Sequence, residues 1–194
     1  SSFQIDINAN WKLAVENYCD GYHLPWVHPA LNNSSRLEDH YGIQEPDRYS
    51  GQGAHQYQQM QSADGQRFTD FPGASFSADG AEYVSIYPNV LTGIHRDHFF
   101  AIVLQPVAID RTIEHIELYY SESCVANADL EPLRAANARW WRAIFEEDIA
   151  VVEGMQAGRR GHRFDGGRFA PGMDGPTHNF HRWVAKRLLA QQAR

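Results

Sequence analysis

The residues best suited to chemistry lie close together in residues 16–29, which read ENYCDGYHLPWVHP. His23 and His28 are five positions apart, and Pro25 between them keeps the backbone out of regular helical spacing. Neutral imidazole is the commonest side-chain metal ligand, and two imidazoles with a carboxylate suit a divalent first-row metal. Asp20 could be that carboxylate, or it could hold a ligating imidazole through a hydrogen bond. The spacing leaves both roles open, and it also fits a surface turn without metal.

A second acidic segment, residues 146–156, offers a further ligand from far along the chain. Asp148 and Val152 share one face of the helix expected there, so the carboxylate would point to the same side as an apolar neighbour. An inward carboxylate is costly unless it is paired or binds a metal. Asp148 is therefore a candidate third ligand. The alternative is that it joins the two preceding glutamates on a solvated acidic face.

The elements that must position these residues follow from the hydrophobic pattern. Apolar and aromatic residues at helical spacing predict helices over 8–22, 130–158 and 179–191. Runs of β-branched and aromatic residues after position 82 predict an antiparallel meander, and shorter strands are expected in the polar stretch before it. The expected strands lie near 42–44, 51–59, 83–87, 98–106 and 112–123. Strands followed by a long helix predict an α+β domain in which a curved sheet wraps that helix.

Length and composition narrow the class of protein. The chain has 194 residues, which corresponds to one domain, and 43% of them are hydrophobic, which is enough for a sizeable core. The formal net charge of −7 argues against a nucleic-acid surface, which needs a basic stripe. No stretch approaches the ~20 apolar residues of a membrane span, and no signal-peptide pattern opens the sequence. Two cysteines cannot make a disulfide framework, so a reduced, cytoplasmic protein is expected.

The segment Asn10–Pro29, with its Asp-x2-His-x4-His core, resembles the catalytic domain of Rieske non-haem iron oxygenases. These are the α subunits of aromatic-ring-hydroxylating dioxygenases and related monooxygenases. The resemblance covers nearly the whole chain in family order. Its later parts are Tyr87-Pro88-Asn89, a strand pair ending at 104–107, Asp148-x4-Glu153-x2-Gln156, and His181-Arg182-Trp183. It implies a helix-grip (START-like) fold, in which an antiparallel curved sheet surrounds a long C-terminal helix.

The resemblance also implies roles for individual residues. His23 and His28 would be the imidazole ligands of a mononuclear Fe(II), and Asp148 would be its carboxylate ligand. Asp20 would be the bridging carboxylate that links His23 to a ligand of a Rieske cluster on a neighbouring subunit. Asn17, about one helical turn before Asp20, would approach the iron without being a firm ligand.

One departure from the family concerns the electron source. The family carries an N-terminal Rieske domain with a Cys-x-His and Cys-x-x-His pattern for its [2Fe–2S] cluster. Here Cys19 and Cys124 are the two cysteines, and neither is followed by a histidine at the required spacing. Residues 1–194 are therefore expected to be the mononuclear iron domain alone. The cluster would lie on a missing domain or a partner chain, unless the protein is a degenerate paralogue that binds without oxidising.

The resemblance implies an oxygenase that uses O2 to hydroxylate an aromatic ring or to demethylate a small organic substrate oxidatively. Its implied partners are the Rieske domain, a ferredoxin or reductase as electron donor, and two further copies in a homotrimer. Two other classes stay open from the residues themselves. One is a metal-free helix-grip protein that binds a small ligand, and the other is a zinc hydrolase with the same three ligands.

Several other residues receive weaker predictions. A substrate pocket is expected between the sheet and the long helix, and Trp26 is expected to pack over the metal site. His95 and His98 could bind a substrate carboxylate or lie on a water-exposed strand turn. His178 and His181 are interpreted as structural. The residues expected to line the pocket are Tyr83, Ile86, Leu91, Ile94, His98, Phe100, Trp140, Ile144 and Phe145.

Overall fold

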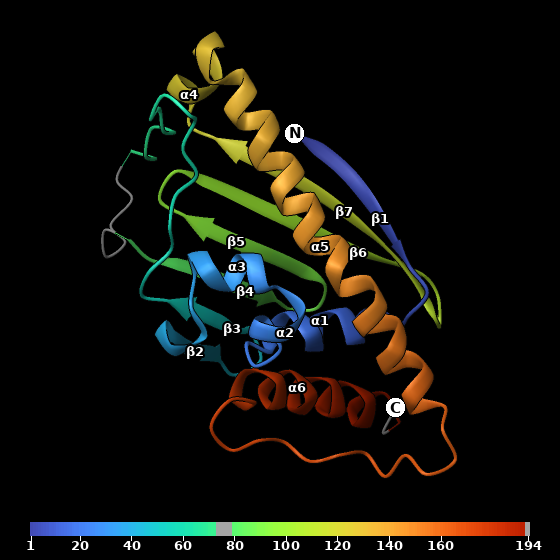
Figure 1. Ribbon diagram of the computed structural model, residues 1–194. Helices are drawn as coiled ribbons and strands as arrows, with labels where there is room; N and C mark the ends of the chain where they lie inside the picture. The colour runs from blue at the N-terminus through green and yellow to red at the C-terminus, as the bar shows by residue number, and fades with distance from the viewer. Residues whose placement is uncertain (73–78, 193–194) are drawn as a thin grey trace.

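The computed structural model describes residues 1–72 and 79–192 and contains a seven-stranded antiparallel sheet (Figure 1). Strands β2 to β7 follow one another in the sheet in chain order, each paired with its neighbour in sequence. The first strand, β1, pairs with the last, β7. The meander expected from the sequence is therefore confirmed. The strands are β1 Ser2–Ile7, β2 His40–Glu45, β3 Tyr49–Ala54, β4 Ala81–Ile86, β5 Val90–His95, β6 His98–Ala108 and β7 Arg111–Tyr120.

The long helix α5 (Glu131–Arg159) crosses one face of the sheet, as the helix-grip prediction requires (Figure 1). Helices α1 (Trp11–Cys19), α2 (Leu24–Val27) and α3 (Pro29–Ser34) lie over the same face. Helix α6 (Gly175–Gln192) packs against α1 and against β2 and β3. The remaining helical segments are α4 Glu122–Ala126 and the 3₁₀ turns η1 Leu37–Asp39 and η2 Ala128–Leu130.

Local sequence explains where the first helices begin and end. The side chain of Asn10 accepts a hydrogen bond from the Lys12 backbone N–H, so α1 starts after it and is shorter than the predicted 8–22 helix. Pro25 and Pro29 lie in the first turns of α2 and α3, where a missing N–H does no harm. Two short helices therefore follow α1 with His23 and His28 at their N-terminal ends.

Two strands were not predicted. In β1 the residues alternate between exposed and buried, with Ile5 and Ile7 in the core, which is the period-2 signal of a half-buried strand. In β5 the run Val90–His95 contains a glycine, Gly93, where an added Cβ would lie 2.1 Å from the ring of Phe100. Glycine at this position lets the β5 backbone lie close to a core aromatic ring. It also interrupts the run of β-branched and aromatic residues by which a strand is predicted from sequence.

The core lies between the inner face of the sheet and the helices that cover it. Trp141 from α5, Phe100 from β6 and Phe180 from α6 are the largest of its fully buried side chains. The inward-facing residues of β7 are Thr112, Glu114, Ile116 and Leu118, so one carboxyl group is buried within this core. Among the described residues, no helix combines the length and the apolar character needed to cross a membrane.

Candidate metal centre

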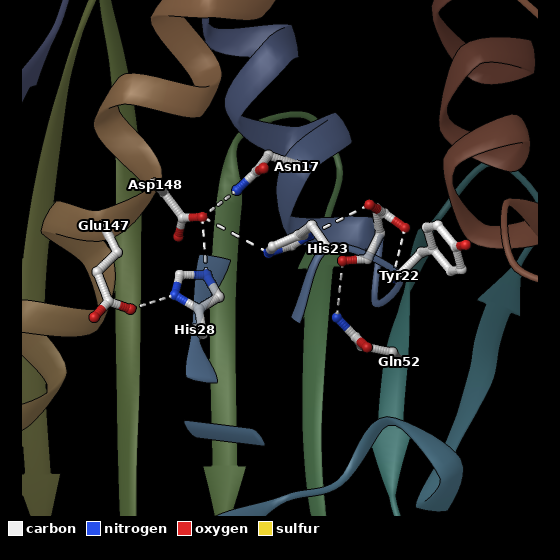
Figure 2. A network of polar contacts seen from close by, with 8 residues as sticks. Asn17, Tyr22, His23, His28, Gln52, Glu147 and Asp148 are labelled. Carbon is white, nitrogen blue, oxygen red and sulfur yellow. Dashed lines mark hydrogen bonds and ion pairs between the residues drawn. The ribbon is translucent and has the colours of Figure 1, made fainter. Parts of the chain in front are cut away.

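Three side chains from two distant parts of the chain converge beneath α5 (Figure 2). The Nε2 atom of His28 lies 3.0 Å from Oδ1 of Asp148, and the Nε2 atom of His23 lies 3.7 Å from the same oxygen. One ligand atom from each residue lies within 4.8 Å of the other two. His23 and His28 come from either end of α2, and Asp148 comes from α5. The fold thus assembles two imidazoles and a carboxylate at one point.

Both imidazoles are held in place by carboxylates on their other nitrogen. Nδ1 of His28 lies 2.7 Å from Oε2 of Glu147, and Nδ1 of His23 lies 3.2 Å from Oδ2 of Asp20. Histidines that bind metals usually donate their second N–H in this way, which fixes the tautomer and the ring orientation. The Nε2 atoms are therefore the ones aimed at Asp148.

Asn17 on α1 completes the arrangement by donating from Nδ2 to Asp148 Oδ1 over 2.7 Å (Figure 2). Burial lowers the pKa of His28, but the hydrogen bonds and charges of Asp148 and Glu147 outweigh it and raise the pKa. The close approach of His28 Nε2 to the carboxylate needs a proton between them, and a metal cation can replace that proton. Two nitrogen donors and one oxygen donor fit a divalent first-row metal.

Asp20 contacts His23 from outside the three converging residues. Its Oδ1 accepts the backbone N–H of Tyr22 over 2.8 Å, and its Oδ2 faces His23. Burial raises the pKa of Asp20, but these hydrogen bonds outweigh burial and lower it below the usual value. Between the two roles that the spacing left open, the structure places Asp20 at the outer imidazole nitrogen and Asp148 among the Nε2 atoms.

A cavity of about 50 Å³ lies next to the three residues. Its wall is mostly apolar and aromatic, with one polar side formed by Ser35, His40 and Gln52. Four of the residues predicted to line the pocket do so, namely Tyr83, Phe100, Ile144 and Phe145. Trp141 lines it in place of the predicted Trp140, because its side of α5 faces the sheet, and Ile86 points to solvent instead.

Three weaker predictions fare differently. Trp26 does not pack over the metal site, because it is 67% exposed and its ring contacts the tilted ring of Tyr22 at the surface. His95 and His98 are not on an exposed turn, since their exposed fractions are 1% and 2%. His181 has a structural role as expected, because its Nε2 pairs with the buried carboxylate of Glu16 from α1.

Two further carboxylates, which the sequence did not single out, lie close to the three converging residues. Glu147, which the alternative interpretation puts on a solvated acidic face, contacts Nδ1 of His28 from a half-exposed position. Helical spacing does not predict the contact between Glu147 and His28. Glu147 is next to Asp148 on α5, and the two carboxylates contact the two different ring nitrogens of His28. Glu114 was missed as well, although its position between Thr112 and Ile116 in an alternating strand already predicts an inward-facing side chain.

Glu114 is buried, and its environment favours the neutral acid. Burial, with a smaller contribution from the charge of Asp148, raises the pKa of Glu114 from 4.5 to about 8. The folded chain therefore keeps a proton that the unfolded chain releases between these pH values. The stability from this group is fully present below pH 4.5 and is lost as the pH rises towards about 8.

Glu114→Gln is expected to flatten this pH dependence. Between pH 5 and pH 8 the metal-free wild-type chain should lose a few kcal/mol of unfolding free energy relative to the variant, since one pKa unit corresponds to ~1.4 kcal/mol. Urea unfolding at the two pH values measures this. Glu117→Gln, on the outward face of β7, is the matched control and should behave like wild type. Parallel pH profiles for wild type and Glu114→Gln would contradict the prediction.

Comparison with known proteins adds an independent result. The family described as "Ring hydroxylating alpha subunit (catalytic domain)" matches residues 1–190. The chain is 30% identical to a putrescine 2-hydroxylase of Bordetella bronchiseptica, over 92% of this chain and 44% of that protein. It is 25% identical to the carnitine monooxygenase oxygenase subunit of Acinetobacter baumannii, over 84% of this chain and 42% of that protein. The chain spans less than half the length of these two relatives.

Solved structures give the same fold. A quaternary ammonium Rieske monooxygenase superposes with a TM-score of 0.71 at 21% identity, covering 98% of this chain and 49% of that chain. Dicamba monooxygenase superposes with a TM-score of 0.69 at 16% identity, covering 100% of this chain and 60% of that chain. At sequence identities this low, the superpositions show a similarity of fold and nothing more.

Proposed function

Because the chain belongs to the ring-hydroxylating α-subunit family, as a catalytic domain of this oxidoreductase class, we propose that it holds one Fe(II) on His23, His28 and Asp148. The observation that carries this proposal is the convergence of two Nε2 atoms on one carboxylate oxygen. A bound Fe(II) with two imidazoles and one carboxylate keeps open positions for O2 and supplies the electron chemistry that activates it.

The residues of the chain contribute position and exclusion of water. Glu147 and Asp20 fix the two imidazoles, and Asn17 restrains the Asp148 carboxylate. When the hydrogen-bond partners of metal ligands are removed, the affinity of a site for its metal typically falls about 10–100-fold. These contacts should therefore raise the affinity of this site for iron. The apolar wall beside them keeps the reacting part of a substrate away from bulk water.

The substrate that we propose is a small organic amine or ammonium compound, oxidised by hydroxylation or by oxidative demethylation. The similarity to a putrescine 2-hydroxylase and to a carnitine monooxygenase favours this class over an aromatic hydrocarbon. The cavity supports it, since the aromatic side chains of Tyr83 and Trp141 line it, and aromatic rings attract cations. Its polar side at Ser35, His40 and Gln52 can accept or donate hydrogen bonds to a substrate.

Electrons would come from a Rieske [2Fe–2S] cluster through Asp20, from a domain or partner outside this chain, with a ferredoxin or reductase as donor. Asp20 has a side chain that is 28% exposed, and with His23 it lines a surface cleft of about 320 Å³. A carboxylate in this position can contact a second imidazole from outside while it holds His23. A homotrimer, in which a neighbouring subunit provides that imidazole, fits this arrangement. It also agrees with the inter-subunit electron transfer of the quaternary ammonium monooxygenase.

Iron content tests the proposed site. After anaerobic loading with Fe(II) and removal of unbound metal, we expect about one iron per chain. His23→Ala should lose this iron, because one of three ligands is gone. His40→Ala is the matched control, since His40 lines the same cavity but its ring nitrogens contact Ser35 and Gln52.

The same samples separate the remaining alternatives. Nitric oxide added to the loaded protein gives a paramagnetic signal with Fe(II) and none with zinc, so it distinguishes an oxygenase site from a zinc hydrolase site. Absence of iron from the wild-type chain, or iron that His23→Ala leaves unchanged, would rule out the proposed function and favour a metal-free binding protein.

A further inference from the structure

A chain of buried polar groups lies directly behind the cavity wall. Trp141 donates from Nε1 to Nε2 of His98 over 2.8 Å, and Nδ1 of His98 lies 2.8 Å from Oδ1 of Asp97. The three residues are 1%, 2% and 1% exposed in that order. Neither His98 nor Asp97 belongs to the metal centre, and both come from the β5–β6 turn and the start of β6.

The hydrogen-bond chemistry fixes where the protons are. The indole N–H can only donate, so Nε2 of His98 must accept, and the ring proton must lie on Nδ1, facing Asp97. A carboxylate, an imidazole and a donor in this order leave the imidazole ready to take the donor's proton, because the carboxylate stabilises the imidazolium that forms. Here the donor is an indole, which releases its N–H proton readily only once it has lost an electron.

Trp141 connects this chain to the metal centre. It lines the cavity together with His23, His28 and Asp148. Trp141 and Asp148 are seven residues apart on α5, so they share one helix face about 10 Å apart along its axis. Trp141 also contacts aromatic rings outside the metal centre. Its ring is stacked on that of Tyr57 with centroids 6.4 Å apart, and the ring centroids of Tyr120 and His98 are 6.4 Å apart. Aromatic residues thus continue from the cavity towards the partly exposed Tyr120.

We propose that Trp141 is a redox-active residue that discharges a one-electron oxidant, formed from O2 or peroxide at the metal centre, when no substrate consumes it. This rests on the proposed iron site. One electron passes from the indole to the oxidant. The N–H bond at Nε1 of Trp141 breaks while an N–H bond forms at Nε2 of His98, which leaves a neutral indole radical and an imidazolium paired with Asp97.

The cycle closes by reversal of the same two transfers. One electron from a reductant in solution such as ascorbate, which releases its own proton to water, passes to the indole as the proton moves from Nε2 of His98 back to Nε1 of Trp141. The structure also argues against a merely space-filling role for this cluster. Oδ2 of Asp97 and Nδ1 of His95, whose ring stacks on His98 at 4.1 Å, are buried without a hydrogen-bond partner in the described chain. Apolar residues would fill the same space without that penalty.

Electron paramagnetic resonance tests the proposal on the whole Fe(II)-loaded chain. Hydrogen peroxide is added without substrate, and the sample is frozen within the first turnover. We expect an organic radical whose hyperfine splitting narrows when the protein carries ring-deuterated tryptophan, which identifies it without any substitution. Trp141→Phe should abolish the signal, and Trp140→Phe, one residue away and only partly buried, should retain it.

His98→Phe keeps the indole but removes the proton acceptor, so the radical yield at Trp141 should fall several-fold. Peptide mass spectrometry should then find more oxidative damage at the residues of the metal centre, where the undischarged oxidant forms. A tryptophan signal that Trp141→Phe leaves intact, or no tryptophan radical in an iron-loaded sample, would overturn the proposal. Iron is measured in the same samples. Its absence from the His23, His28 and Asp148 site would instead overturn the proposed function, and with it the source of the oxidant.

Discussion

Alanine in place of Asp148 is expected to abolish iron binding while the fold stays intact. Asp148 is the oxygen donor on which both Nε2 atoms converge, so its loss should weaken iron by more than the ~10–100-fold that follows removal of an outer partner. The side chain is only partly buried and its charge raises the pKa of Glu114. The metal-free variant also loses the hydrogen bonds from Asn17 and His28 to Asp148, which offsets the relief of Glu114, so it should stay folded and unfold at a urea concentration close to that of wild type.

Iron per chain after anaerobic dialysis and urea unfolding of the metal-free protein measure the two halves of this expectation. Glu146→Ala is the matched control, because Glu146 lies two residues away on α5 and pairs with Arg142 at the surface. It should keep its iron. Iron retained by Asp148→Ala at wild-type affinity would show that the three converging residues do not form the metal site.

Alanine in place of Trp141 is expected to cause the largest loss of stability. The indole is fully buried among Phe100, Phe145 and Tyr83, and large-to-small changes at such positions cost ~3–5 kcal/mol. The change also leaves Nε2 of His98 without its donor, which adds to the cost. Against a typical total of ~5–15 kcal/mol, a large part of the unfolding free energy would be lost.

Urea unfolding followed by far-ultraviolet circular dichroism measures this loss. Trp140→Ala, on the partly exposed side of the same helix, should cost clearly less and serves as the control for removing an indole from α5. Equal losses in the two variants would mean that the buried aromatic cluster around Trp141 does not dominate the core. Trp141→Phe, which keeps an aromatic ring, should fold and is therefore suited to the radical experiment.

The sequence was informative wherever one strong pattern acted alone. The period-2 runs in β4, β6 and β7 and the long apolar stripe of α5 predicted the sheet and the helix across it. The cluster around His23 predicted which residues would converge with Asp148. The roles of Asp20 and Asp148 could not be separated by spacing. Their difference is a matter of which imidazole nitrogen each carboxylate meets, and tertiary structure decides that.

The misses have physical causes as well. Trp26 lies between the two histidines in sequence, but α2 turns its side chain outward, so proximity along the chain did not become proximity to the site. His95 and His98 flank a turn, which predicts exposure. They are buried because Tyr57, Trp141 and the neighbouring rings close over them. Contacts of this kind join residues far apart in sequence and leave no local pattern.

The pairing of the first strand, β1, with the last strand, β7, has a consequence for how the chain folds. Ile7 pairs with Thr112, and His28 meets Asp148 across a sequence separation of 120 residues. Contacts this distant raise the contact order, and closing such long loops costs entropy before the contacts that compensate it can form. The last strand pairing and the arrival of α5 should therefore come late in folding. If the proposed site binds iron, tight binding would begin only after these steps. The rate of iron uptake during refolding would then report how fast β1 and α5 reach their native positions.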